Sequence, residues 1–133
     1  MSGLVTFIGV VHPWMCDVMG HMNVRHYAGM FDDASFQLLG QIAEKIPDES
    51  FGWADVRSTT DYKREVPAGD LLTIRSQVLK IGRSSITFRQ IMAGSLDGEL
   101  RATNETTSVC FDKNARISLE LEHAMRIRAE KFS

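Results

Sequence analysis

The stretch from Val24 to Lys45 constrains the fold of this chain more than any other feature of the sequence. At 3.6 residues per turn, five polar side chains fall on one narrow stripe: His26, Asp33, Gln37, Gln41 and Glu44. Most of the remaining circumference is apolar or small: Tyr27, Ala28, Gly29, Met30, Phe31, Ala34, Leu38, Leu39, Ile42 and Ala43. A helix that lies on a flat sheet does not need so broad an apolar arc. The pattern therefore predicts a long helix wrapped by a curved sheet, with Pro47 closing the helix.

Strand patterns precede and follow this helix. The segment from Leu4 to Val11 is apolar and β-branched, which predicts a strand buried on both faces. His12-Pro13 ends it because proline cannot donate to a strand ladder. After the helix, strand-like patterns cover residues 54–66, 71–81, 84–93 and 99–111, with turn signals at 67–70, 82–83 and 95–98. The last segment, residues 118–131, predicts a short helix with Ser118 as its N-cap.

This element order predicts an α+β fold in which a long central helix packs against a five-stranded antiparallel sheet. We expect residues 1–133 to form a single domain, since a chain of 133 residues supports one core. The edges of such a sheet are exposed unless a second subunit continues it, so the sequence predicts a dimer at least. Asp32 is the one carboxylate on the apolar arc, and we expect it at a helix edge or a subunit contact, because burial without a partner is costly.

The segment from Asp17 to Tyr27 gathers chemically useful side chains just before the helix. Asp17, His21 and Asn23 place a carboxylate, an imidazole and a carboxamide within seven residues. Asn23 is the predicted N-cap, whose side-chain oxygen accepts from a first-turn N–H group. The remaining free N–H groups and the helix dipole favour negative charge at this point. An acid, a histidine and an anion-stabilising helix start suggest acyl-transfer chemistry, although a plain turn would use the same residues.

Composition excludes several classes of partner. The chain is 44% hydrophobic and 24% charged with a net charge of −2, so we expect neither nucleic acid nor a membrane surface as partner. A local group of basic residues could still hold a phosphorylated ligand. Cys16 and Cys110 are the only cysteines and form no metal-ligand spacing. Residues 1–11 carry no signal-peptide pattern and no stretch is apolar enough to cross a bilayer, so we expect a cytoplasmic protein with free thiols.

The chain resembles hotdog-fold acyl-CoA thioesterases of the 4-hydroxybenzoyl-CoA thioesterase type. The resemblance is carried by Asp17, by Gly20-His21-Met22-Asn23 with Tyr27, by Phe31-Asp32-Asp33-Ala34, by Tyr62-Lys63-Arg64-Glu65, by Gly69 to Ile74 and by Gly82-Arg83-Ser84-Ser85. It implies a helix enclosed by the sheet, a homodimer that often pairs into a homotetramer, and active sites at the dimer interface. A coenzyme A thioester is then the substrate, and neither a metal nor another cofactor is needed. The layout also resembles the thioesterase portion of carnitine-degradation proteins, which would favour a polar, short acyl group.

The resemblance implies a role for each residue of the loop. Asp17 either attacks the thioester carbonyl, giving a mixed anhydride, or acts as base to the hydrolytic water. His21 orients Asp17 or water, protonates the departing thiolate, or only pins the loop. Asn23 contacts substrate or caps the helix, which would aim the backbone N–H groups of Asn23, Val24 and Arg25 at the oxyanion. Cys16 is a weaker candidate nucleophile.

Binding residues follow from the same resemblance. Tyr27, Met30 and Phe31 are candidates for the acyl pocket, with plain core packing as the alternative. The coenzyme A candidates are Arg83, Ser84, Ser85 and Arg64, because the planar fork of arginine suits phosphate.

Two other functions use the same fold. One is an acyl-CoA hydratase or dehydratase, which usually carries a different pairing of histidine and acid that the later half of this chain lacks. The other is an acyl-CoA-binding protein without activity, since fold alone does not fix function.

Overall fold

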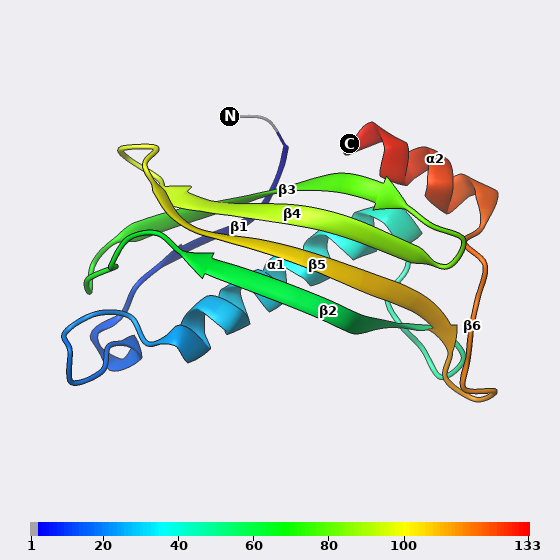
Figure 1. The fold of residues 1–133 in the computed structure, drawn as a ribbon, viewed down its shortest axis with the longest axis horizontal. Coiled ribbons are helices and arrows are strands. Elements are labelled where there is room, and N and C mark those ends of the chain that lie inside the picture. The colour runs from blue at the N-terminus through cyan, green and yellow to red at the C-terminus, as the bar shows by residue number, and fades with distance from the viewer. Residues whose placement is uncertain (1–2) are drawn as a thin grey trace.

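A computed structural model describes residues 3–133 (Figure 1). The elements in chain order are β1 (Leu4–Val10), η1 (Pro13–Met15), α1 (Val24–Ala43), β2 (Gly52–Tyr62), β3 (Leu71–Ile81), β4 (Ser85–Gly94), β5 (Leu100–Asp112), β6 (Ile117–Ser118) and α2 (His123–Lys131). The five long strands pair antiparallel in the order β1-β3-β4-β5-β2, and the short β6 pairs with β5. The predicted helix and five-stranded antiparallel sheet are therefore confirmed.

The helix α1 crosses one face of the sheet, and α2 lies beside its C-terminal end (Figure 1). One face of α1 is buried, and it carries Tyr27, Met30, Phe31, Ala34, Ser35, Leu38, Leu39, Ile42 and Ala43. These side chains pack with alternate residues of the strands, such as Ile74 of β3 and Met92 of β4 near the helix start and Phe88 of β4 near its end. Residues that recur with a period of 3.6 on the helix thus pack against residues that recur with a period of 2 on the strands.

The predicted wrapping of α1 is incomplete in the single chain. Ala28, Gly29, Phe36 and Gly40 belong to the apolar or small part of the circumference, yet all four are exposed. Phe36 keeps 61% of its surface accessible. This chain's own sheet therefore covers most but not all of the apolar arc, and the side of α1 that carries these four residues stays uncovered.

The prediction for the first strand was wrong in one respect. β1 is not buried on both faces, because Thr6 is its only buried residue and Ile8 is 73% exposed. β1 lies at the edge of the sheet and pairs only with β3. An apolar, β-branched segment does not distinguish an edge strand from a central one.

Two element boundaries also differ from the sequence predictions. β2 ends at Tyr62 and not at residue 66, since the N–H groups of both Lys63 and Arg64 turn to the carbonyl of Arg101. Ser118 does not cap a helix but pairs with Phe111 in the β5–β6 ladder. The last helix begins only at His123, with Glu122 as its N-cap residue.

Candidate active site

The loop from Cys16 to Met22 holds the carboxylate of Asp17 in a fixed position. A bridge between Cys16 and Met22 closes the loop, and the N–H of Asp17 donates to the carbonyl of His21 at 3.1 Å. Gly20 adopts a φ of +83°, a conformation that favours glycine, and its N–H donates to the carbonyl of Asp17. The local sequence Asp-x-x-Gly-His therefore forms a tight turn, and this turn also presents the carboxylate of Asp17.

Two donors hold that carboxylate. The N–H of Met19 donates to Oδ1 of Asp17 at 2.9 Å, and Nδ2 of Asn23 donates to Oδ2 at 3.0 Å. These bonds favour the charged form, so the hydrogen bond from Asn23, followed by that from Met19, lowers the pKa of Asp17 below its ordinary value. Asp17 is exposed, so its carboxylate is both ionised at neutral pH and accessible.

Asn23 caps α1 as predicted, and its side chain links the helix to Asp17. Its Oδ1 accepts from the N–H of Arg25 at 3.1 Å, while its Nδ2 bonds Asp17. Of the three backbone N–H groups expected to face an oxyanion, two already have acceptors. That of Asn23 donates to the carbonyl of Met15 at 2.9 Å, and that of Arg25 to its cap. Of these three, only the N–H of Val24 has no acceptor among the residues that the structure describes.

His21 lies against a different partner from the one expected. Its Nε2 is 3.3 Å from Oε2 of Glu65, a residue of the β2–β3 connection, and among the described residues the imidazole forms no hydrogen bond with the carboxylate of Asp17. Half-buried His21 thus ties the loop to that connection. Its backbone carbonyl accepts from the N–H of Asp17, which closes the same turn.

The three residues expected in the acyl pocket are all buried in the core of the chain. Tyr27 makes an edge contact with the ring of Tyr62, and its hydroxyl donates to the carbonyl of Arg64 at 3.4 Å. Burial raises the pKa of Tyr27. Met30 alone lines a cavity, one of about 440 Å³ between β1 and the first half of α1. Phe31 packs into the core cluster that also contains Tyr27 and Met30.

The predicted coenzyme A residues lie at two opposite ends of the sheet. Arg64 is beside the Asp17 loop, where it pairs with Glu99. Arg83, Ser84 and Ser85 form the β3–β4 turn next to α2, and the carbonyl of Arg83 accepts from Leu121. The whole of β3 separates this turn from Asp70, which meets Val11 at the loop end of the sheet. Eleven residues of strand span about 35 Å. One chain therefore does not bring Arg83 to Asp17.

A larger cavity, of about 700 Å³, was not anticipated from the sequence. It lies between the exposed side of α1 and the start of β2, and its walls include Phe36, Leu39, Ile46, Trp53 and Phe111. Asp32 is exposed at its margin, as expected for a helix edge, and partial burial followed by repulsion from Asp55 raises its pKa. The sequence did contain one signal for this cavity: Phe36 is a large apolar residue that lies outside the buried arc of the helix.

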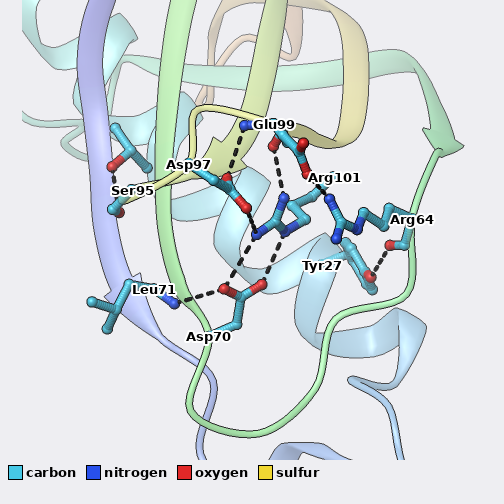
Figure 2. A network of polar contacts seen from close by, with 9 residues as sticks. Tyr27, Arg64, Asp70, Leu71, Ser95, Asp97, Glu99 and Arg101 are labelled. Carbon is cyan, nitrogen blue, oxygen red and sulfur yellow. Dashed lines mark hydrogen bonds and ion pairs between the residues drawn. The ribbon is translucent and has the colours of Figure 1, made fainter.

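An ion cluster around the buried Arg101 was also missed (Figure 2). The guanidinium of Arg101 on β5 bonds the carboxylates of Asp70 and Asp97 and the carbonyl of Glu99. Asp70 and Asp97 lie in the predicted turns 67–70 and 95–98, and neither had been expected to pair with an arginine. Cys16 is half-buried against the core near the loop, and Cys110 is buried.

Among the residues that the structure describes, no helix is long and apolar enough to cross a membrane. The same residues contain no group of three or more histidine, cysteine or acidic side chains that could hold a metal ion.

Comparisons with known proteins agree with this architecture. A family model described as "Thioesterase-like superfamily" matches residues 11–131. The long-chain acyl-CoA thioesterase FadM of Escherichia coli (strain K12) is 26% identical over 130 residues, which cover 92% of this chain and 94% of the relative.

Solved structures extend the likeness. A Staphylococcus aureus protein determined in complex with CoA superposes with a TM-score of 0.87 at 16% identity, covering 99% of this chain and 85% of that one. A hexameric, broad-specificity acyl-coenzyme A thioesterase superposes with a TM-score of 0.81 at 20% identity, covering 98% and 94%. At these identities the likeness shows the fold, and the hotdog arrangement inferred from sequence is confirmed.

Proposed function

Because the chain belongs to the thioesterase-like superfamily, we propose that it is an acyl-CoA thioesterase that uses Asp17 to hydrolyse an acyl-CoA to a free acid and coenzyme A. One observation carries the proposal: an ionised, accessible carboxylate is fixed by Asn23 directly before the start of α1. A carboxylate at this position can act on a carbonyl whose oxygen rests near the helix N-terminus. FadM, which has a similar sequence over nearly its whole length, is itself a long-chain acyl-CoA thioesterase.

Two routes use the same residues. As a base, Asp17 takes a proton from water while the water oxygen attacks the thioester carbonyl; the tetrahedral oxyanion then collapses and expels the coenzyme A thiolate. As a nucleophile, an Asp17 oxygen attacks the carbonyl and displaces the thiolate, and water hydrolyses the resulting anhydride. In both routes the thiolate gains a proton from solvent or His21. The N–H of Val24 is the backbone donor available to the oxyanion, and one such donor is worth ~3 kcal/mol of barrier.

Coenzyme A binding and assembly belong to the same proposal. When coenzyme A binds, one of its phosphates would replace Glu99 as the ion-pair partner of Arg64. In a homodimer, the turn of Arg83, Ser84 and Ser85 would bind the coenzyme A portion of a substrate whose thioester lies at Asp17 of the second subunit.

The open edge of β2 suggests how this homodimer forms. Antiparallel pairing of two β2 strands places the Gly52 end of one beside the Tyr62 end of the other. The Arg83 turn lies at the Gly52 end, since the carbonyl of Ser84 accepts from Cys110, which pairs with Trp53. Asp17 lies at the other end. Further pairing into a homotetramer would be a separate contact; a relative with this fold is hexameric.

The test is thiol release from a panel of short, long, aromatic and cationic acyl-CoAs. We expect hydrolysis of at least one class, and Asp17→Asn to lower kcat by about 100-fold or more. Asp48→Asn is the matched control, because Asp48 is an exposed loop acid at the other end of the sheet. Its Oδ1 accepts the backbone N–H groups of Ser50 and Phe51, and its pKa, like that of Asp17, is lowered, first by the bond from Ser50. Binding without thiol release, hydration of an enoyl-CoA, or equal rates for both variants would contradict the proposal.

A further inference from the structure

Arg101 is a buried cation whose side chain is fully engaged. It is 5% exposed. Its Nε and Nη2 bond the two carboxylate oxygens of Asp70 at 2.9 and 3.3 Å, Nη2 also bonds Asp97 at 3.0 Å, and Nη1 bonds the carbonyl of Glu99 at 2.9 Å (Figure 2). The bonds to Asp70 raise the pKa of Arg101 further. Buried ion pairs often add little net stability compared with apolar side chains of the same size. The stability of the chain alone therefore does not account for this arrangement.

The same residue holds both ends of the connection between β2 and β3. At the start, the carbonyl of Arg101 accepts from the N–H groups of Lys63 and Arg64 at 2.9 and 3.1 Å. At the other end of the connection, its side chain donates two parallel hydrogen bonds to the carboxylate of Asp70, a geometry that fixes direction as well as distance. The connection from Lys63 to Asp70 is therefore clamped at both ends by one arginine.

The middle of this connection is the surface on which the candidate loop rests. The carbonyl of Val66 accepts from the N–H of Met22 at 2.7 Å, and Glu65 faces His21 at 3.3 Å. Val11, which follows β1 and precedes η1, bonds Gly69 and Asp70 at 2.7 and 3.0 Å. The segment from Val11 to Met22, which carries Asp17, is thus attached to the connection at its start and at its end.

We infer that Arg101 is a positioning residue of the candidate active site: by clamping Lys63–Asp70 it sets where the Asp17–Asn23 loop stands relative to the start of α1. The inference rests on the proposed function for its effect on rate, but its structural content does not depend on the reaction. Displacement of a reacting group by about 1 Å can cost about 100-fold in rate. Arg101 touches no substrate and acts through Val66, Glu65 and Asp70.

The test compares Arg101→Met and Arg101→Lys with Arg128→Met. Arg128 is a fair control because its guanidinium is likewise held by three groups, two backbone carbonyls and the acid Glu44, but at the far end of α1. With each variant measured well below its unfolding temperature, we expect Arg101→Met to lower kcat by about 100-fold with little change in KM. Arg101→Lys keeps the charge but loses the fork, so it should recover part of that loss. Arg128→Met should retain the kcat of the parent protein.

Amide hydrogen exchange gives a readout that needs no activity. We expect the N–H of Met22 to exchange at least tenfold faster in the Arg101 variants and unchanged in Arg128→Met. Equal exchange at Met22 in all the proteins, or a loss of kcat shared by Arg128→Met, would overturn the inference. If Arg101→Met does not fold, Arg101→Lys decides by the same two measurements. If the parent protein hydrolyses no acyl-CoA, the proposed function fails, and the exchange comparison still decides the role of Arg101.

Discussion

A single hydrogen bond distinguishes the candidate catalytic carboxylate from an ordinary turn residue. Asp17 and Asp48 are both exposed, and both accept backbone N–H groups from residues that follow them. Asp17 alone also accepts from a helix N-cap, the amide of Asn23. That bond places the carboxylate at the start of α1, so the local environment and not the residue type separates the two acids.

Substitutions of Asn23 can separate its two tasks. Asn23→Ser keeps an oxygen that can cap α1 but removes the amide donor, so we expect little loss of stability at pH 7 and a rise in the pKa of Asp17. Asn23→Ala removes both and should lose about 1 kcal/mol in the free energy of unfolding. Chemical denaturation and carbon-detected titration of the Asp17 carboxyl measure these effects.

The dependence of stability on pH follows from the direction of that shift. The pKa of Asp17 in the folded chain lies below its ordinary value of 3.8. The contribution of Asp17 to the free energy of unfolding is therefore present above its pKa in the unfolded chain. It is lost as the pH falls through its pKa in the folded chain. In both Asn23 variants, the free energy of unfolding should therefore decrease less on acidification than in the parent protein. A titration of Asp17 that is the same in the parent and in Asn23→Ser would show that the amide does not hold the carboxylate.

The C-terminal end of α1 depends on tertiary contacts more than on its own sequence. Glu44 adopts a φ of 55°, in the left-handed region, and no glycine stands at this position. Arg128 of α2 donates to the carbonyls of Ile42 and Ala43 and pairs with Glu44 at 3.1 Å. The helix therefore ends two residues before Lys45, where the periodicity alone would have continued it.

Glu44→Gly should increase the free energy of unfolding by about 0.5–1 kcal/mol. Relief of a left-handed non-glycine residue is worth about 1–2 kcal/mol, and the exposed ion pair that is lost is worth less than about 1 kcal/mol. Gln41→Gly, at an exposed site inside the helix, should instead lose about 1 kcal/mol. Urea denaturation of both variants tests this. Destabilisation of similar size in the two would mean that the Glu44 backbone carries no strain.

Elements with long, regular patterns were predictable from the sequence, and those defined by distant partners were not. The period of α1 and the alternation of β3 gave their positions within two residues. Ser118 looked like a helix cap because its local sequence does not reveal its pairing with Phe111. Asp17 and Asn23 were predicted because their spacing is local. Arg101 was not, because Asp70 is 31 residues away along the chain.

At the scale of the whole molecule, the parts of the proposed site are divided between the two ends of one sheet. Asp17 and Arg64 stand at one end and the turn of Arg83 at the other. β2, an edge strand of eleven residues, and the open face of α1 lie between them. An exposed edge of this length is a liability unless another strand covers it. A two-fold partner would cover the edge and would also join the two halves of the site.

Phe36→Glu tests this assembly. Phe36 is exposed on the open face of α1 beside the cavity that contains Trp53, so in a free chain its replacement by glutamate, a good helix former, should cost only about 0.5 kcal/mol, from repulsion by Asp32 one turn before it. In a dimer that buries this face, an unpaired carboxylate would be desolvated, which is strongly unfavourable. We therefore expect light scattering after gel filtration to give twice the chain mass for the parent protein and a single chain mass for Phe36→Glu. Thiol release should fall together with the mass, because the Arg83 turn is lost from the site. Ile127→Glu, which removes an exposed apolar side chain from α2, should keep the parent's mass and rate. A Phe36→Glu monomer with the parent's rate would show that one chain holds the complete site.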